Sequence, residues 1–243
     1  GAVRLVGPTV LSATDIANLE ALAGVRVIVE AASPLRLQHT YGGKLMTDPN
    51  FGCTSGFTTK DAVSGTTGVL TAGHCFPGDA TYWQDGTTKY LADLSGKRWD
   101  KNQDFAWYQT SHVESPEFFD GFALRTQTAT KPRLEMEGNN VCHSGITTGY
   151  SCGLAEDIHY QPPSLVCNGQ ICDAVWLRVI DSGTPGGAYD IDCAGGDSGG
   201  PYFWGHTAWG THTAGTEPNC TYTVVMTVGA LQWDGVNTRI LLP

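Results

Sequence analysis

Three short stretches of the sequence carry side chains whose types suit nucleophilic catalysis. Ser198 lies in "GGDSGGP" (195–201), where four glycines surround one serine and one acid. His74 lies in "LTAGHC" directly before Cys75, and Asp104 opens the apolar run "DFAWY". A serine nucleophile needs a base to take its proton, an acid to orient that base and donors for the developing oxyanion. The three stretches predict Ser198 as the nucleophile, His74 as the base and Asp104 as the orienting acid.

The glycines around Ser198 give this segment unusual backbone freedom. Glycine inside regular structure lowers stability, so a cluster marks backbone that turns tightly or approaches a ligand closely. Here the cluster frees the N–H groups of Gly196 and Ser198 to point into one small cavity, as an oxyanion hole requires. Alone, each motif also fits a structural role: a packed histidine, a turn aspartate or a glycine turn. Their occurrence together, with Cys75 after the histidine, favours catalysis.

A second class of hydrolase has a similar glycine-flanked serine. "GDSGG" fits the G-x-S-x-G nucleophile elbow of α/β-hydrolases, whose triad follows the chain order serine, acid, histidine. The acids after Ser198 are Glu217 and Asp234, and the last histidine of the chain is His212. No histidine follows either acid, so the chain order excludes this class.

Composition limits the classes of partner that the chain could have. The 243 residues suffice for a substantial core, and no apolar run approaches the length of a membrane span. A formal net charge of −10 at pH 7 argues against nucleic-acid binding, which needs a basic surface. The start lacks a basic segment followed by an apolar one, so we expect any signal peptide to have been removed.

The cysteines indicate the compartment. The chain has eight of them, without a C-x-x-C pair, and His74 and His143 are the only histidines adjacent to one. This spacing is poor for zinc, so we predict four disulfides, an oxidising extracellular setting and no metal. Eight cysteines allow 105 pairings, and counting alone does not choose among them.

The catalytic stretches lie among short strands. A helix is predicted over 12–23 and a strand over 25–30. From Phe51 onward, short β-rich runs separated by glycine, proline, asparagine or aspartate indicate a β-barrel or sandwich. The clearest runs are 67–72, 104–109, 174–180 and 222–228, and 181–189 is predicted to be a loop.

"TAGHC", "DFA" and "GGDSGGP", in the order His, Asp, Ser, resemble the motifs of chymotrypsin-like serine proteases from about Tyr41 to the C-terminus. The stretches 141–153 and 210–220 resemble the disulfide hairpin and pocket strand of the bacterial streptogrisin and α-lytic branch. The resemblance implies an all-β protease domain over 40–243. Its two perpendicular six-stranded antiparallel β-barrels, over about 40–125 and 126–243, would hold the active site in the cleft between them.

The resemblance also implies the activity. A secreted, monomeric serine endopeptidase would hydrolyse peptide or protein substrates through an acyl-enzyme intermediate, without a cofactor, and with highest activity above neutral pH. The alternatives are a catalytically silent binding protein of the same fold and a zymogen blocked by its pro-segment. Residues 1–39 form a helix-strand extension in this scheme, either as a retained pro-segment piece or as an integral part.

Specific pairings follow from the same resemblance. It implies the disulfides Cys53–Cys75, Cys142–Cys152 and Cys193–Cys220, and with these a fourth between Cys167 and Cys172.

Asp197, directly before the nucleophile, needs a partner because an unpaired buried carboxylate is costly. The branch places an arginine where this chain has His143, so we expect a structural ion pair between Asp197 and a protonated His143. Lys44 and Arg133 are the alternative cations.

Two residues near the expected specificity pocket favour opposite substrate side chains. Asp192 in the pocket would favour basic substrate side chains, whereas His212 in "GTHTAG" resembles the histidine of glutamyl endopeptidases and favours acidic ones. We expect an acidic preference, ahead of basic or apolar choices. Thr213 occupies the position of a serine that the family hydrogen-bonds to the catalytic acid. The expected pocket residues are Asp192, Ala194, His212, Thr213, Ala214 and Gly215.

Overall fold

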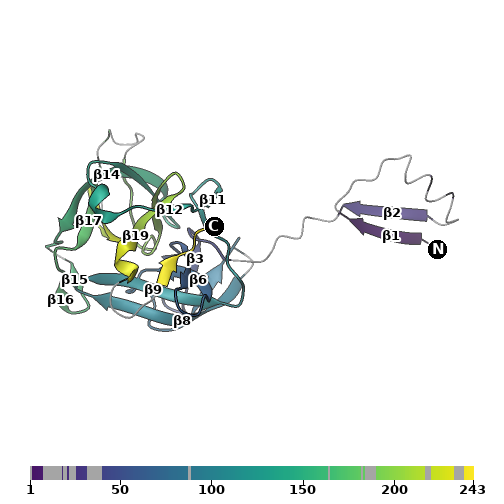
Figure 1. Cartoon of the computed structure of the whole chain (residues 1–243), viewed down its shortest axis with the longest axis horizontal. Helices are drawn as coiled ribbons and strands as arrows, with labels where there is room; N and C mark the ends of the chain where they lie inside the picture. Colours follow the sequence, from purple (N-terminus) through teal and green to yellow (C-terminus); the bar gives the residue numbers. More distant parts are fainter. Residues whose placement is uncertain are drawn as a thin grey trace. The chain divides into compact units, whose positions relative to one another are not determined.

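The computed structural model of the chain describes residues 2–7, 18, 21, 26–31, 40–86, 89–163, 165–181, 183, 190–216, 220–232 and 238–243 (Figure 1). Contacts divide the chain into two compact units, Gly1–Gln38 and His39–Pro243. The predicted loop over 181–189 lies mostly outside the described residues.

The first unit contains a pair of parallel strands. β1 (Ala2–Gly7) pairs in register with β2 (Arg26–Ala31), from Ala2 opposite Arg26 to Gly7 opposite Ala31. β2 covers the predicted strand, whereas β1 was not anticipated. Most of the predicted helix over 12–23 lies outside the described residues, although Asn18 and Ala21 are helical.

An antiparallel eight-stranded sheet forms one half of the second unit. It positions His74 and Asp104, because β6 and β9 are neighbours within it. β9 is buried along almost its whole length, which explains the apolar run Phe105–Tyr108 at its centre. The strands in sheet order are β21 (Thr238–Ile240), β5 (Thr58–Asp61), β6 (Thr67–Thr71), β9 (Gln103–Thr110), β8 (Lys89–Asp100), β7 (Ala80–Trp83), β3 (Leu45–Thr47) and β4 (Gly52–Thr54).

A closed barrel forms the other half. A pairing between β19 and β20 closes six strands, and β12 (Ala129–Thr130) adds to β19 from outside. Figure 1 shows β14, β17 and β19 on the opposite side of this unit from β8 and β9. The barrel strands in order are β19 (Thr207–Gly215), β18 (Pro201–Trp204), β13 (Asn140–Gly145), β14 (Gly149–Tyr160), β17 (Trp176–Ile180) and β20 (Tyr222–Thr227).

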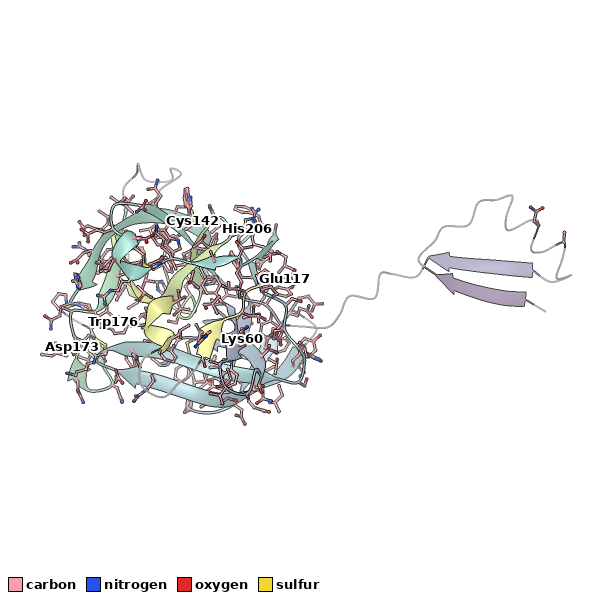
Figure 2. The ribbon with its side chains drawn as sticks, in the orientation of Figure 1. Lys60, Glu117, Cys142, Asp173, Trp176 and His206 are labelled. Atoms are coloured by element: carbon pink, nitrogen blue, oxygen red, sulfur yellow. A yellow bond between two sulfur atoms is a disulfide. The ribbon has the colours of Figure 1, made fainter. Side chains whose placement is uncertain are left out.

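Small elements complete the second unit. Two short antiparallel hairpins are formed by β10 with β11 and by β15 with β16. Asp173, after β16, pairs with Lys101 in the β8–β9 turn at 3.0 Å and can be located in Figure 2. The remaining bounds are β10 (Glu117–Phe119), β11 (Leu124–Thr126), β15 (Val166–Cys167), β16 (Gln170–Ile171) and the 3₁₀ turns η1 (Arg133–Glu135) and η2 (Val228–Gln232).

The end of the chain returns to the first half, which corrects the expected boundary of the second barrel at residue 243. β21 pairs with β5, with Arg239 opposite Lys60, so these residues belong to the eight-stranded sheet. Gln127 reinforces this crossing, because its side-chain amide donates to the carbonyls of Thr58 and Leu241 at 2.7 Å each. A buried strand needs backbone partners, and β5 supplies them.

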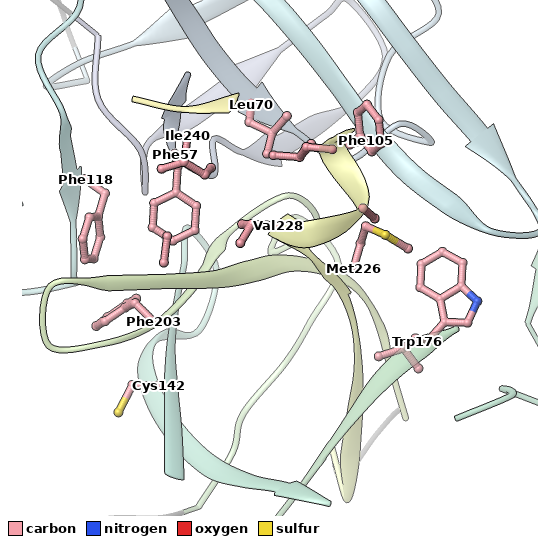
Figure 3. Packing of buried hydrophobic residues seen from close by; sticks show 14 of the residues in the cluster. Phe57, Leu70, Phe105, Phe118, Cys142, Trp176, Phe203, Met226, Val228 and Ile240 are labelled. Carbon is pink, nitrogen blue, oxygen red and sulfur yellow. The ribbon is translucent and has the colours of Figure 1, made fainter. Parts of the chain in front are cut away.

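One apolar cluster joins the two halves. Phe57 precedes β5, Phe118 lies in β10 and Phe203 lies in β18. The ring of Phe118 is 5.2 Å from that of Phe57 and 4.8 Å from that of Phe203, and Figure 3 shows the three rings together. The same cluster includes Trp176, which is fully buried. Because Ser198 comes from one half and His74 and Asp104 from the other, this packing fixes the spacing of the three residues.

All eight cysteines are paired within the described residues. The disulfides are Cys53–Cys75, Cys142–Cys152, Cys167–Cys172 and Cys193–Cys220, as the family resemblance implies. Each closes a loop and stabilises the fold by about 2–4 kcal/mol, mainly through the unfolded chain.

Replacing Phe118 tests the joint between the halves. Phe118→Ala should lower the free energy of unfolding by about 3–5 kcal/mol, because it leaves a cavity between Phe57 and Phe203. The control is Phe51→Ala, at a side chain that is 62% exposed, and it should change stability by less than about 0.5 kcal/mol. Denaturant unfolding measures both. Equal effects of the two substitutions would contradict this account of the packing.

Candidate active site

His74 and Asp104 are brought together by the pairing of β6 with β9. Thr71 at the end of β6 lies opposite Ala106, so the turn after β6 passes over the start of β9. His74 uses both oxygens of the Asp104 carboxylate: its backbone N–H donates to Oδ1 at 2.9 Å, and its Nδ1 lies 2.8 Å from Oδ2. Asp104 is fully buried. The carboxylate therefore fixes the imidazole and selects the tautomer with hydrogen on Nδ1.

Ser198 reaches the same imidazole from the other half of the unit. Its Oγ lies 2.9 Å from Nε2 of His74. The backbone of Ser198 is held on the first half, where its carbonyl accepts from the N–H of Thr54 at 2.8 Å. The next residue bonds the second half, because Gly199 donates to the carbonyl of His212 at 2.7 Å. The structure thus assembles the three side chains that the sequence singled out for the catalytic chemistry.

The protonation of His74 reflects competing effects. Burial lowers the pKa of His74, but the charge of Asp104 and its hydrogen bond raise it, and the net result is a raised pKa. Lys97 opposes this increase, because its positive charge disfavours an imidazolium. Lys97 also donates from Nζ to the carbonyl of Phe76 at 2.7 Å, two residues after His74.

The backbone directly before Ser198 turns at Gly196. Gly196 has φ +100°, which disfavours a side chain, and a Cβ there would lie 2.5 Å from Oγ1 of Thr147. The carbonyl of Gly196 accepts from Oγ1 of Thr54 at 2.8 Å. Within the described part of the chain, neither Gly196 N–H nor Ser198 N–H has an acceptor. Both expected donors remain available for a ligand.

Asp197 is held by neutral groups, which corrects the ion pair expected with His143. Oδ1 accepts from the N–H groups of Thr147 at 2.8 Å and Thr148 at 3.2 Å. Oδ2 accepts from Oγ1 of Thr148 at 2.7 Å and from the N–H of Ala194 at 2.9 Å. Charge-assisted hydrogen bonds of this kind compensate a fully buried carboxylate without a cation.

His143 occupies a different environment from the one expected. It is fully buried, and burial lowers its pKa to about 3, so its ring is neutral. Nδ1 lies 3.2 Å from Oγ of Ser151, and Nε2 has no hydrogen-bond partner. The ring stacks on Tyr202 at 5.0 Å, and His212 lies 5.4 Å away. The sequence identified the position but not the solvent exclusion that removes its charge.

A cavity of about 200 Å³ adjoins the nucleophile. Four of the expected pocket residues line it, and the disulfide between Cys193 and Cys220 borders it. Its lining residues are Cys193, Ala194, Gly195, Ser198, His212, Ala214 and Gly215.

Two of the expected pocket residues do not line this cavity. Asp192 is exposed, and its carboxylate accepts from the N–H of Cys193 at 2.8 Å, so it caps the local backbone. Thr213 is buried, and its Oγ1 has no hydrogen-bond partner, so the bond expected to Asp104 is absent. Neighbouring residues in a strand point to opposite faces, and here His212 and Ala214 take the pocket side.

His212 is connected to a hydroxyl chain inside the barrel. Its Nδ1 lies 3.3 Å from the hydroxyl of Tyr202, which donates to Oγ1 of Thr223 at 2.7 Å. Burial lowers the pKa of His212, and the charge of Asp197 opposes this shift. The free imidazole is therefore neutral, and its ring is nearly parallel to Tyr202, at an interplanar angle of 12°.

Trp99 is a site residue that the sequence analysis missed. It lies opposite Asp104 in the β8–β9 pairing, and its ring is 5.5 Å from that of His74. The register of the β8–β9 hairpin is the signal that could have identified it. Trp99 gives the His74 imidazole an aromatic neighbour.

Among the described residues, no cluster of three or more histidine, cysteine, aspartate or glutamate side chains could hold a metal ion. No helix in that same part of the chain has the length and apolar character needed to span a membrane.

Comparison with known proteins identifies relatives of this arrangement. The model of the Trypsin family matches residues 41–233, which is most of the chain. The comparison with curated proteins finds no match.

Solved structures with the same fold are bacterial chymotrypsin-like proteases, and the chain has this all-β fold. Thermobifida fusca Protease A is 21% identical with a TM-score of 0.67, over 85% of this chain and 100% of that one. Cellulomonas bogoriensis chymotrypsin is 22% identical with a TM-score of 0.64, over the same shares. A glutamic acid specific serine protease that utilizes a histidine triad in substrate binding is 18% identical with a TM-score of 0.63, over 79% and 96%.

Because Asp104 and Lys97 carry opposite charges near His74, removing either charge should shift the pKa of His74 in opposite directions. Asp104→Asn should lower the pKa of His74, because the carboxylate stabilises the imidazolium, and Lys97→Met should raise it. NMR titration of the His74 imidazole measures both shifts. Lys101→Met, at a lysine paired with Asp173, is the matched control and should leave the pKa unchanged. A lower pKa in Lys97→Met would contradict the assignment of charges.

Proposed function

Because the chain belongs to the trypsin family of serine endopeptidases, we propose that Ser198, His74 and Asp104 hydrolyse peptide bonds through an acyl-enzyme intermediate. The observation that carries the proposal is the continuous hydrogen-bonded chain of 2.8 Å and 2.9 Å contacts from Asp104 through His74 to Ser198. All three members are present and aligned, which disfavours a catalytically silent binding protein.

The geometry supports a defined sequence of proton transfers. His74 Nε2 takes the proton of Ser198 as its Oγ attacks the scissile carbonyl, and the carbonyl oxygen becomes an oxyanion facing the N–H groups of Gly196 and Ser198. His74 then donates that proton to the leaving amine, and water hydrolyses the acyl-enzyme by the reverse steps. Asp104 stabilises the imidazolium without itself accepting the proton.

We propose that the eight-stranded sheet is the other barrel of the fold, beside the closed six-stranded one. The substrate would bind between these two halves as an added strand. β18 pairs with β19 as far as Thr211, and Gly199 and Gly200 bond His212. The same edge over residues 213–215 is then available to a peptide backbone. The four disulfides favour secretion into an oxidising environment, and we propose that the enzyme acts there as a monomer without a cofactor.

Labelling of the nucleophile tests the proposed chemistry. A fluorophosphonate should modify Ser198 stoichiometrically, and a chelator should leave peptide hydrolysis intact. Ser198→Ala should remove labelling and reduce turnover to the residual level of about 10³-fold over water that the remaining groups support. Mass spectrometry of the modified peptide locates the label. A folded wild-type protein that resists labelling would contradict the proposal.

We propose an acidic substrate side chain for the pocket. His212 lines the cavity, and its Nδ1 lies 3.3 Å from the hydroxyl of Tyr202, which leaves Nε2 for a substrate side chain. Asp192 caps backbone outside the cavity, so no carboxylate among the lining residues favours lysine or arginine. A structural relative with glutamic acid specificity uses histidines in substrate binding, which supports the same preference here.

The hydrogen bonds from His212 through Tyr202 to Thr223 are compatible with a His212 that gains a proton when the substrate binds. The hydroxyl of Tyr202 donates to Thr223, so toward His212 it serves as an acceptor for Nδ1–H. A neutral ring in this tautomer presents a lone pair at Nε2, which a carboxylate repels. Binding of a glutamate carboxylate therefore requires an imidazolium, with one N–H on Tyr202 and the other on the substrate. The incoming charge itself raises the pKa of His212.

Substitution of His212 tests this preference. His212→Val should lower kcat/KM for cleavage after Glu by at least about tenfold, since a hydrogen bond to a charged group contributes about 1.5–3 kcal/mol. Cleavage after Gln or Leu should change much less. Paired peptides that differ only at this residue, assayed with wild type and variant, measure the effect. Strong wild-type cleavage after Arg or Lys with none after Glu would refute the acidic preference.

A further inference from the structure

The turn between β13 and β14 touches the nucleophile segment at two separate points. Thr148 contributes its N–H and its hydroxyl to the carboxylate of Asp197. Thr147 contributes its N–H to the same carboxylate and its hydroxyl to the carbonyl of Gly195, at 2.8 Å. Two adjacent threonine side chains thus hold the residues that precede Ser198.

These contacts determine where the oxyanion donors point. In a trans peptide the N–H lies opposite the preceding carbonyl. Thr147 holds the carbonyl of Gly195, so the N–H of Gly196 is directed away from the turn. Asp197 is fixed in the same way: Gly200 donates to its carbonyl at 2.9 Å, so the N–H of Ser198 faces the other side. Both N–H groups depend on the turn, one directly and one through Asp197.

The turn is itself fixed by both halves of the unit. The N–H of Ile146 donates to Oγ1 of Thr54 at 3.0 Å, and that oxygen donates to the carbonyl of Gly196. Cys142 and Cys152 lie opposite each other in the hairpin and are joined by a disulfide. A Cβ on Gly145 would lie 2.1 Å from Oδ1 of Asp197, so only glycine allows the carboxylate to approach the turn.

We propose that Thr147 and Thr148 are positioning residues whose hydroxyls, on the Gly195 carbonyl and the Asp197 carboxylate, organise the oxyanion hole in place of a cation on Asp197. This inference rests on the proposed hydrolytic function of Ser198. The two threonines do not touch the reacting atoms. They act through the backbone donors of Gly196 and Ser198.

The position of these contacts determines which kinetic constant they affect. The oxyanion forms only after attack, so a misdirected donor weakens the transition state and leaves substrate binding nearly unchanged. Loss of a whole donor costs about 10²–10³ in kcat, and a donor that is loosened rather than lost should cost about tenfold. The pocket lining does not include either threonine, so KM should stay near the wild-type value.

The experiment compares Thr148→Val and Thr147→Val with Thr148→Ser and Thr147→Ser on one peptide substrate. The valine variants should lower kcat about tenfold with little change in KM, and the serine variants should restore it, because serine keeps the hydroxyl. Thr128→Val is the matched control: Thr128 is exposed and only its backbone is used, so kcat should not change. Circular dichroism confirms that each variant is folded.

The outcomes separate this inference from the proposed function. Wild-type protein without activity or labelling at Ser198 would refute the hydrolytic function itself. Active wild type with unchanged kcat in both valine variants would overturn the positioning role alone, as would serine variants that are as impaired as the valine ones. If Thr148→Val does not fold, Thr147→Val decides, because Thr147 is exposed and its hydroxyl bonds, among the described residues, the Gly195 carbonyl alone.

Discussion

The buried carboxylate of Asp104 is the constraint on which the site depends. It is fully buried, so its charge must be compensated within the protein. His74 provides both donors, one from its backbone and one from its ring, and the pairing of β6 with β9 brings them there. The same bonds that stabilise the carboxylate therefore set the tautomer, orientation and raised pKa of the imidazole. The two hydrogen bonds from His74 therefore both stabilise the buried carboxylate and prepare the imidazole to act as a base.

The second constraint is that the nucleophile belongs to the other half of the molecule. Oγ of Ser198 must lie within hydrogen-bonding distance of Nε2 of His74, although the two residues are far apart in the chain. The carbonyl of Ser198 accepts from Thr54, and the ring of Phe118 packs against rings from both halves. The C-terminal strand β21 also ties the two halves together, because the chain returns from the closed barrel and pairs with β5 of the eight-stranded sheet. Misplacement by about 1 Å is costly in catalysis, which explains why several independent contacts fix this joint.

Features that depend on residue type could be predicted from the sequence. Features that depend on which side chains are buried together, such as the charge of a histidine, could not. The strand runs and the candidate catalytic residues were visible in residue types and spacing, whereas the disulfide pairings came from the family resemblance. The charge of His143 was wrong, because a sequence does not show that its ring is enclosed by Tyr202 and His212. Asp192 was placed in the pocket, although a short backbone cap satisfies it. The pairing of β21 with β5 was missed because it joins residues from opposite ends of the domain.

The neutral support of Asp197 and the pocket histidine are physically linked. An arginine or protonated histidine at position 143 would place a positive charge next to His212, whose ring is 5.4 Å from that of His143. At an effective dielectric constant of about 20, that repulsion would be about 3 kcal/mol. Such a charge would oppose the protonation that an acidic substrate requires. With His143 neutral and Asp197 held by threonines, the negative charge of Asp197 instead raises the pKa of His212 against the effect of burial. In the proposed mechanism, hydroxyl groups in place of a cation would therefore support the oxyanion hole and leave the pocket able to accept a negative charge.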